Sequence, residues 1–130
     1  MVLSAKKQEH KVMNILVVDD AKSMQEIIVF TIKGMGYGYE VASNGQMALE
    51  FARNKHFDLI LTDINMPEMD GFILTQELRK LKGYAHTPIL VLSTEFSPEM
   101  KDKGREVGAT GWIIKPFNHD KLIAAIEKLI

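Results

Sequence analysis

The chain contains no cysteine, and this absence excludes several kinds of chemistry. Disulfide bonds, thiolate nucleophiles and cysteine-ligated zinc or iron–sulfur sites all require cysteine, and a chain without it suits a reducing compartment. Long apolar runs are missing as well. No segment approaches the roughly 20 apolar residues that a membrane-spanning helix needs, and Met1–Lys11 is too polar for a signal peptide. We therefore expect a soluble cytoplasmic protein that is not exported.

An excess of charge of one sign is also lacking. The 16 Lys and Arg residues nearly balance the 17 Asp and Glu residues, which leaves a formal net charge of -1 and no broad reason to bind nucleic acid or an anionic membrane. With 130 residues, 46% hydrophobic and 25% charged, the chain suits one globular domain and is too short for two. Residues 1–13 are mostly polar. We predict an N-terminal arm over 1–13 and one domain over 14–130.

Short apolar runs alternate five times with segments of helical periodicity from Asn14 onward. Four of the runs are continuously apolar, which is typical of parallel strands that are buried on both faces. The run that contains Glu40 is predicted to be an edge strand. Strand–helix alternation of this kind predicts a single doubly wound α/β domain. The candidate strands are Ile15–Val18, Tyr39–Ala42, Leu59–Leu61, Ile89–Leu92 and Trp112–Ile114.

The predicted helices differ in the apolar surface that they offer to a core. Asn44, Ser97 and Asn118 are candidate N-caps of the second, fourth and fifth helices. The fourth helix has only two large apolar side chains among many charged ones, so we expect it to be the least anchored element. The apolar positions expected to face inward are Met24, Ile27, Ile28, Ile32 and Met35 in the first helix, Met47, Ala48 and Phe51 in the second, Phe72, Leu74, Leu78 and Leu81 in the third, Met100 and Val107 in the fourth, and Leu122, Ile123, Ile126, Leu129 and Ile130 in the last.

Chemically active side chains follow four of the five predicted strands. Ligands of such sheets bind beyond the carboxyl ends of the strands, so these residues should share one crevice. Three carboxylates there would raise one another's pKa values unless a cation joined them, and one lysine leaves a cluster charge of about −2, which suits Mg²⁺ and its preference for oxygen ligands. The four groups are Asp19-Asp20, Asp63, Ser93-Thr94 and Lys115-Pro116.

Each feature alone also has a purely structural interpretation. Asp19-Asp20 could cap a helix, Asp63 could open a turn, and Ser93 could be a buried hydroxyl bonded to backbone. Lys115-Pro116 could simply end a strand. Their coincidence at four strand ends of one sheet favours a functional site.

From Asn14 to Ile130 the sequence resembles the receiver domain of two-component response regulators, and among these the stand-alone chemotaxis type, which is CheY-like. The resemblance rests on the acidic pair after the first strand, on the segment from Asp63 to Gly71 (DINMPEMDG), on Ser93 at 30 positions after Asp63, and on Lys115-Pro116-Phe117 at 22 positions after Ser93. It implies a flavodoxin-like (βα)5 fold with strand order 2-1-3-4-5.

The resemblance also implies a role for each residue at these strand ends. Asp63 would accept a phosphoryl group from a sensor histidine kinase in a Mg²⁺-dependent reaction. Ser93 would contact the phosphoryl oxygens, and Lys115 would pair with the acidic pocket or the phosphoryl group. The bond between Lys115 and Pro116 would be cis. The metal ligands would be Asp19, Asp20, Asp63 and the backbone carbonyl of Asn65.

Two further pairs of residues bear on how the phosphorylated state is read and how long it lasts. Ser93 and Trp112 match the switch positions of the family, in which Tyr or Phe is more frequent than Trp. The exchange of the aromatic side chain between inward and outward rotamers, known in the family, could therefore be partial or shifted here. The alternative that Trp112 is a static core or edge residue remains. Asn65 and Glu95 match positions that flank the path of the hydrolytic water, which suggests a short-lived phosphoryl state.

The resemblance further implies how the signal leaves the protein. We expect the fourth helix, the fifth strand and the fifth helix to form the output surface, and the signal to pass by binding another protein. A flagellar motor switch is the favoured partner, a phosphatase is possible, and a monomer is favoured. On this interpretation the chain is no enzyme beyond catalysing its own phosphorylation and dephosphorylation.

Several alternatives remain at this point. A stand-alone receiver outside chemotaxis could be a phosphorelay intermediate or a phosphate sink, and an inactive receiver could serve as a binding scaffold. A Mg²⁺-dependent phosphatase of the haloacid dehalogenase type would need Asp-x-Asp after the first strand, and a flavodoxin would need a hydroxyl-rich loop there. The four histidines show no metal-binding spacing and are expected in loops or at a terminus; they are His10, His56, His86 and His119.

Overall fold

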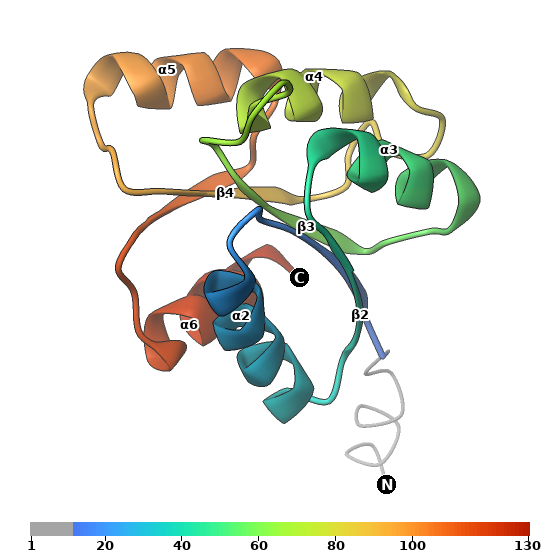
Figure 1. The fold of residues 1–130 in the computed structure, drawn as a ribbon, viewed down its shortest axis with the longest axis vertical. Coiled ribbons are helices and arrows are strands. Elements are labelled where there is room, and N and C mark those ends of the chain that lie inside the picture. Colours follow the sequence, from blue (N-terminus) through green and yellow to red (C-terminus); the bar gives the residue numbers. More distant parts are fainter. Residues whose placement is uncertain (1–11) are drawn as a thin grey trace, which may run out of the picture.

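The computed structural model describes residues 12–130, and a five-stranded parallel sheet lies at its centre (Figure 1). The strand order is β2-β1-β3-β4-β5, so the predicted doubly wound fold and its strand order are confirmed. Most of the predicted arm over residues 1–13 lies outside the described residues. The strands are β1 (Asn14–Val18), β2 (Gly38–Ala42), β3 (Leu59–Asp63), β4 (Ile89–Ser93) and β5 (Gly111–Ile114).

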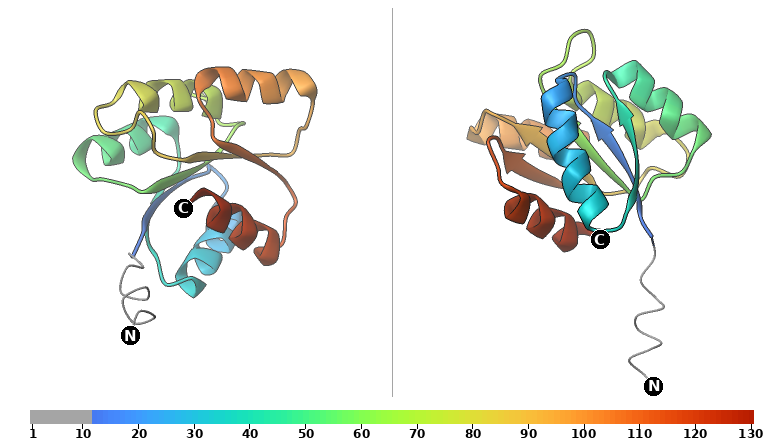
Figure 2. Two further views of the ribbon diagram at one scale, coloured as in Figure 1. Left: turned by 180° about the vertical axis from the view of Figure 1, so that it is seen from behind. Right: turned by 60° about the horizontal axis from the view of Figure 1, so that its bottom comes forward.

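Helices cover both faces of the sheet (Figures 1 and 2). On one face lie α2 (Lys22–Gly34) and α6 (His119–Leu129), and on the other lie α3 (Gly45–Asn54), α4 (Gly71–Lys80) and α5 (Pro98–Val107). The side chains of Asn44, Ser97 and Asn118 accept backbone N–H groups at the starts of α3, α5 and α6, as predicted. Within residues 12–130, every helix is too short or too polar to span a bilayer.

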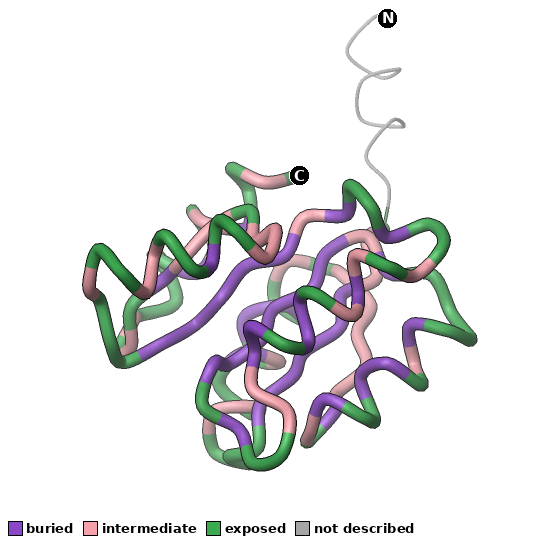
Figure 3. Tube along the Cα trace, turned by 90° about the horizontal axis from the view of Figure 1, so that it is seen from above, coloured by how far each residue is buried: buried purple, intermediate pink, exposed green. Residues whose placement is uncertain are grey.

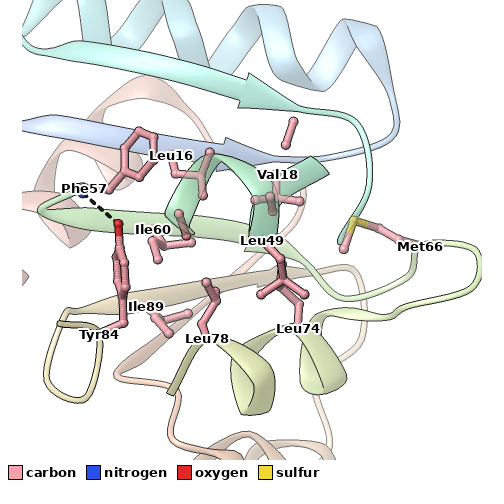
Figure 4. Close-up of a cluster of buried hydrophobic side chains, with 13 residues drawn as sticks. Leu16, Val18, Leu49, Phe57, Ile60, Met66, Leu74, Leu78, Tyr84 and Ile89 are labelled. Carbon is pink, nitrogen blue, oxygen red and sulfur yellow. Dashed lines mark hydrogen bonds between the residues drawn. The ribbon is translucent and has the colours of Figure 1, made fainter. Parts of the chain in front are cut away.

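The central strands are buried, and the helices turn their outer faces to solvent (Figure 3). Every residue of β3 and β4 is buried, whereas in β2 only Ala42 is, which confirms the prediction from Glu40 that β2 is an edge strand. The continuous apolar run of β5 predicted burial on both faces, and this is wrong, because β5 is the other edge of the sheet and only Ile113 in it is buried. Under α3 and α4, apolar side chains such as Leu16, Ile60 and Leu78 form one core cluster (Figure 4). A second cluster fills the opposite face under α2 and α6.

Three apolar side chains that the periodicity placed inward are largely exposed. Ile27 in α2 is 43% exposed, Met47 in α3 is 40% exposed, and Ile130, directly after α6, is 46% exposed. In α2 the buried side chains are Ile28, Thr31 and Ile32, so the covered stripe is narrow and Ile27 lies beside it. The Thr31 hydroxyl is tolerated there because it donates to the carbonyl of Ile27 and contacts the ring nitrogen Nδ1 of His119.

For α5 and α6, one prediction from the sequence is wrong and one agrees with the structure. His119 is the first residue of α6 and so does not lie in a loop. In α5 only Gly104 is buried, and this agrees with the prediction that this helix is the least anchored.

Candidate functional site

Three carboxylates meet at the carboxyl ends of β1 and β3. Asp19 and Asp20 follow β1, Asp63 is the last residue of β3, and one carboxylate oxygen of each lies within 4.8 Å of the others. Asp19 and Asp63 are buried, with exposed fractions of 0% and 7%, whereas Asp20 is exposed. The structure thus brings together the three acidic residues that the sequence placed at neighbouring strand ends.

Asp19 is held in place by several interactions. Its backbone N–H donates to the carbonyl of Ala42 at the end of β2 (3.1 Å), and its Oδ1 accepts the N–H of Ala21 (2.9 Å). Its carbonyl accepts a hydrogen bond from the side chain of Gln25 at 2.6 Å. The capping interpretation is wrong for this pair, because the N-cap of α2 is Ala21 and no side chain caps the helix. The second carboxylate oxygen of Asp19 meets Lys115 in the site.

Lys115 joins β5 to the acidic cluster. Its Nζ lies 3.1 Å from Oδ2 of Asp19 and 3.2 Å from Oδ1 of Asp63, and its side chain is only 13% exposed. Its backbone N–H donates to the carbonyl of Ser93 (2.8 Å), so the lysine is fixed beside the end of β4. The Lys115–Pro116 peptide bond is cis, as the resemblance implied.

The charges of the cluster favour the binding of a cation. Burial raises the pKa of Asp63, the negative charge of Asp19 raises it further, and Lys115 offsets only part of the effect. Three carboxylates with one ammonium group carry about −2 when ionised, which one divalent cation neutralises.

The donor set fits Mg²⁺ by its chemistry. It consists of hard carboxylate oxygens from three residues, and the exposed position of Asp20 leaves the site open to water, which Mg²⁺ retains when bound to protein. Asn65, whose carbonyl the resemblance assigns to the metal, stands two residues after Asp63 and is exposed.

The loop from β3 to α4 is closed tightly behind Asp63. The N–H of Gly71 donates to the carbonyl of Ile64 (2.8 Å), and Glu68 adopts a positive φ of 70°. A Cβ built on Gly71 would lie 2.9 Å from Cα of Ile64 and closer still to the carbonyl oxygen of Asp63. Gly71 is therefore required for the backbone of α4 to approach the backbone of Asp63.

The two residues expected to act as a switch lie on adjacent strands. Ser93 ends β4, is 1% exposed, and its Oγ accepts the N–H of Glu95 at 3.0 Å. Trp112 in β5 pairs with Val91 in β4, and Val91 stands two residues before Ser93. Glu95, expected to influence dephosphorylation, is exposed at the start of the β4–α5 loop.

Sequence reasoning missed two supporting residues near this region. Arg79 in α4 donates to the carbonyls of Gly108 (2.7 Å), Tyr84 (2.8 Å) and Thr87 (2.6 Å), and so ties the end of α5 to α4 and to the segment before β4. Gly104 lies against Trp112. A glycine in the middle of a predicted helix was a signal that could have revealed the second contact.

The protein is thus a doubly wound α/β domain with three carboxylates at the carboxyl ends of its strands and a lysine paired with two of them. The family model of the response regulator receiver domain matches residues 15–127 of the chain. The protein belongs to this family.

Solved structures and curated sequences extend the comparison. The chemotaxis response regulator CheY4 of Vibrio cholerae superposes with a TM-score of 0.90 at 41% identity, over 92% of this chain and 100% of that one. A response regulator of Burkholderia multivorans is 40% identical with a TM-score of 0.76, over 92% of this chain and 95% of that one. The transcriptional regulatory protein ZraR of Escherichia coli K12 is 36% identical over 93% of this chain, but the chain spans only 27% of its length.

Proposed function

We propose that this receiver domain accepts a phosphoryl group on Asp63 from a sensor histidine kinase in a Mg²⁺-dependent reaction, and signals to a partner protein in chemotaxis. The observation that carries the proposal is the placement of Asp63 within 4.8 Å of two further carboxylates, with Lys115 paired to its Oδ1 at 3.2 Å.

The residues present suit phosphoryl transfer to a carboxylate. One oxygen of Asp63 forms a bond to phosphorus while the bond from phosphorus to the donor histidine nitrogen breaks, and the product is an aspartyl phosphate. Asp19, Asp20, Asp63 and the carbonyl of Asn65 would hold Mg²⁺. When bound there, the cation neutralises charge on the transferring phosphoryl oxygens.

Lys115 and Ser93 act beside the acceptor. The ammonium group of Lys115 lies 3.2 Å from Oδ1 of Asp63, so it is close enough to pair with an oxygen of a phosphoryl group on Asp63. Ser93 is buried at the end of the adjacent strand and offers a hydroxyl to one of those oxygens. The roles of Asn65 and Glu95 in tuning dephosphorylation stay predictions, and so does the view that the chain catalyses no reaction beyond its own phosphorylation state.

The output surface that we propose lies on α5, β5 and α6. A groove of about 250 Å³ between α5 and β5 is lined by Lys101 and Arg105 together with Trp112, which suits an acidic segment of a partner. The similarity to CheY4, a chemotaxis protein by its description, favours a flagellar motor switch as this partner. A monomeric cytoplasmic protein is the form that we expect to bind it.

A receiver outside chemotaxis is the second candidate. The relatives at 36% identity include a transcriptional regulator of which the chain matches only the receiver portion, so likeness of the receiver alone does not determine the output. Such a chain would pass its phosphoryl group on, or store it, without binding a motor.

The first experiment tests the phosphoacceptor. Beryllofluoride, an analogue of the phosphoryl group, is added with Mg²⁺ to the wild type and to Asp63→Asn, and bound fluoride is recorded by ¹⁹F NMR. We expect a bound signal in the wild type only, and only with Mg²⁺. Equal binding by Asp63→Asn would contradict the assignment.

The second experiment separates chemotaxis from the other outputs. The purified flagellar motor switch protein from the source organism is titrated against the wild type with and without beryllofluoride, and against Arg105→Glu. If the protein binds the motor switch protein more tightly with beryllofluoride than without it, and Arg105→Glu weakens this binding, the result supports a role in chemotaxis. Absence of binding in both states favours the relay or sink.

A further inference from the structure

Asp20 has the fewest contacts of the three carboxylates. Asp19 and Asp63 are buried, and both are paired with Lys115. Asp20 is exposed, and among residues 12–130 no hydrogen bond or ion pair involves its side chain. One of its carboxylate oxygens nevertheless lies within 4.8 Å of an oxygen of each of the other two. The backbone on either side of Asp20 therefore sets the position of this carboxylate.

The start of α2 does little to fix this backbone. Its N-cap is Ala21, which has no side-chain acceptor, and its first turn contains no acidic residue. Helices α3, α4, α5 and α6 each begin with a side chain that accepts a backbone N–H. The turn from β1 into α2 therefore depends on contacts other than a helix cap.

Gln25, one turn into α2, makes such a contact. Its side-chain Nε2 donates to the carbonyl of Asp19 at 2.6 Å and to Oγ of Ser43, the residue directly after β2, at 3.3 Å. A carboxamide nitrogen has two hydrogens, so it can serve both acceptors. Among residues 12–130 the Asp19 carbonyl accepts no other hydrogen bond. Gln25 thus holds this carbonyl and joins the end of β1 to the end of β2.

The two peptides that flank Asp20 are held by different groups. The N–H of Ala21, which belongs to the peptide after Asp20, donates to Oδ1 of Asp19 at 2.9 Å. The carbonyl of Asp19 belongs to the peptide before Asp20, and Gln25 holds it. Because a peptide is planar, a rotation of this carbonyl also moves the nitrogen and Cα of Asp20. Asp19 has further bonds to Ala42 and Lys115, so loss of the Gln25 contact should displace Asp20 more than Asp19.

We propose that Gln25 is a positioning residue of the metal site, which holds the peptide before Asp20 so that the Asp20 carboxylate stays within reach of a cation bound by Asp19 and Asp63. Ser43 orients the carboxamide of Gln25. Strand β2, whose carboxyl end carries no ionisable group, contributes to the site in this way. The inference rests on the proposed function, because the position of Asp20 matters only if the site binds Mg²⁺.

The first test measures the affinity for Mg²⁺ by titration calorimetry. Gln25→Met keeps an unbranched side chain, removes both donors and adds no charge, and Gln76→Met makes the same change at an exposed position of α4. We expect Gln25→Met to raise the Kd about tenfold or more, as is usual when a group that orients a metal ligand is lost, and Gln76→Met to leave it unchanged. An unchanged Kd in Gln25→Met would overturn the inference and leave the proposed function standing. Absence of Mg²⁺ binding by the wild type would overturn both.

The second test separates a role through Asp20 from a general loss of structure. The ¹³C shifts of the side-chain carboxyl groups of Asp20 and Asp63 are recorded without Mg²⁺ and at saturation. We expect Gln25→Met to lose at least half of the Mg²⁺-induced shift of Asp20 and to keep that of Asp63. Equal losses at both carboxyl groups would overturn a role through Asp20.

A third variant ranks the two contacts of Gln25. Ser43→Ala removes the acceptor at 3.3 Å and leaves the bond to the Asp19 carbonyl at 2.6 Å. We expect it to raise the Kd for Mg²⁺ by less than Gln25→Met does. An increase as large as that of Gln25→Met would overturn the assignment of the main contact to the Asp19 carbonyl.

Discussion

Gly71 joins the fold to the phosphoacceptor, and its replacement by alanine is the sharpest perturbation that the structure offers. The added Cβ would meet the carbonyl oxygen of Asp63 and Cα of Ile64, the latter at 2.9 Å. Both are backbone atoms at the end of β3, so no side-chain rotation relieves the conflict. The start of α4 and the end of β3 must move apart instead.

The size of the effect follows from this geometry. An extra carbon in a well-packed site costs about 1–3 kcal/mol, and alanine returns up to about 1 kcal/mol through its helix propensity. Because only backbone can yield, we take the upper part of the range and expect Gly71→Ala to lose about 2 kcal/mol of unfolding free energy. Gly34→Ala, which meets no atom within 4 Å, should instead gain up to about 1 kcal/mol.

Urea denaturation of the two variants measures this difference. The two variants should differ by about 2–3 kcal/mol, so with a slope of about 1–3 kcal/mol per molar urea their midpoints should differ by about 1–3 M. Beryllofluoride binding should weaken in Gly71→Ala because the backbone of Asp63 is displaced, and should not change in Gly34→Ala. A midpoint for Gly71→Ala equal to or above that of Gly34→Ala would refute the reasoning.

Three further perturbations have defined outcomes. Burial and the charge of Asp19 raise the pKa of Asp63 in the folded protein. Without Mg²⁺ the unfolding free energy should therefore decrease as the pH rises from about 4, the ordinary pKa of Asp, through the raised pKa of Asp63. Urea titrations across this pH range should show no such decrease in Asp63→Asn. Tyr84→Phe leaves the buried N–H of Phe57, now 3.0 Å from the Tyr84 hydroxyl, without an acceptor, so thermal or urea unfolding should show a loss of about 1–3 kcal/mol. Arg79→Met removes donors to three backbone carbonyls and should lower stability by at least about 2 kcal/mol, whereas an unchanged urea midpoint would show that water replaces them.

The strands and the site were predictable because their signals are local. A continuous apolar run such as Ile15–Val18 has few alternatives to a central strand, and the residue after such a run is fixed at the sheet edge. Asp63 and Lys115, distant in sequence, were therefore placed together by topology alone, and their atoms lie 3.2 Å apart.

Contacts made by helices were less predictable, because periodicity gives the direction of an apolar stripe but not its width. Ile27, Met47 and Ile130 are therefore largely exposed although the periodicity placed them inward. Arg79 gave no signal, since its partners are backbone carbonyls that any sequence provides. The fit of Gly104 to Trp112 depends on the distance between a helix and a strand, which no local pattern encodes.

The two ends of α5 are anchored differently, and this predicts where the helix responds. Its carboxyl end is tied to α4, because Arg79 donates twice to the carbonyl of Gly108 at 3.1 and 2.7 Å. Its amino end follows the exposed loop that begins directly after Ser93, and between the two ends Gly104 lies against Trp112. A shift at Ser93 should therefore tilt the amino-terminal half about a fixed carboxyl end. Amide chemical shifts recorded with and without beryllofluoride should change more from Ser97 to Gly104 than in the last turn, and Arg79→Met should spread the change to the whole helix. Uniform changes in the wild type would mean that α5 moves as one body, and Arg79 would then have no part in directing the response.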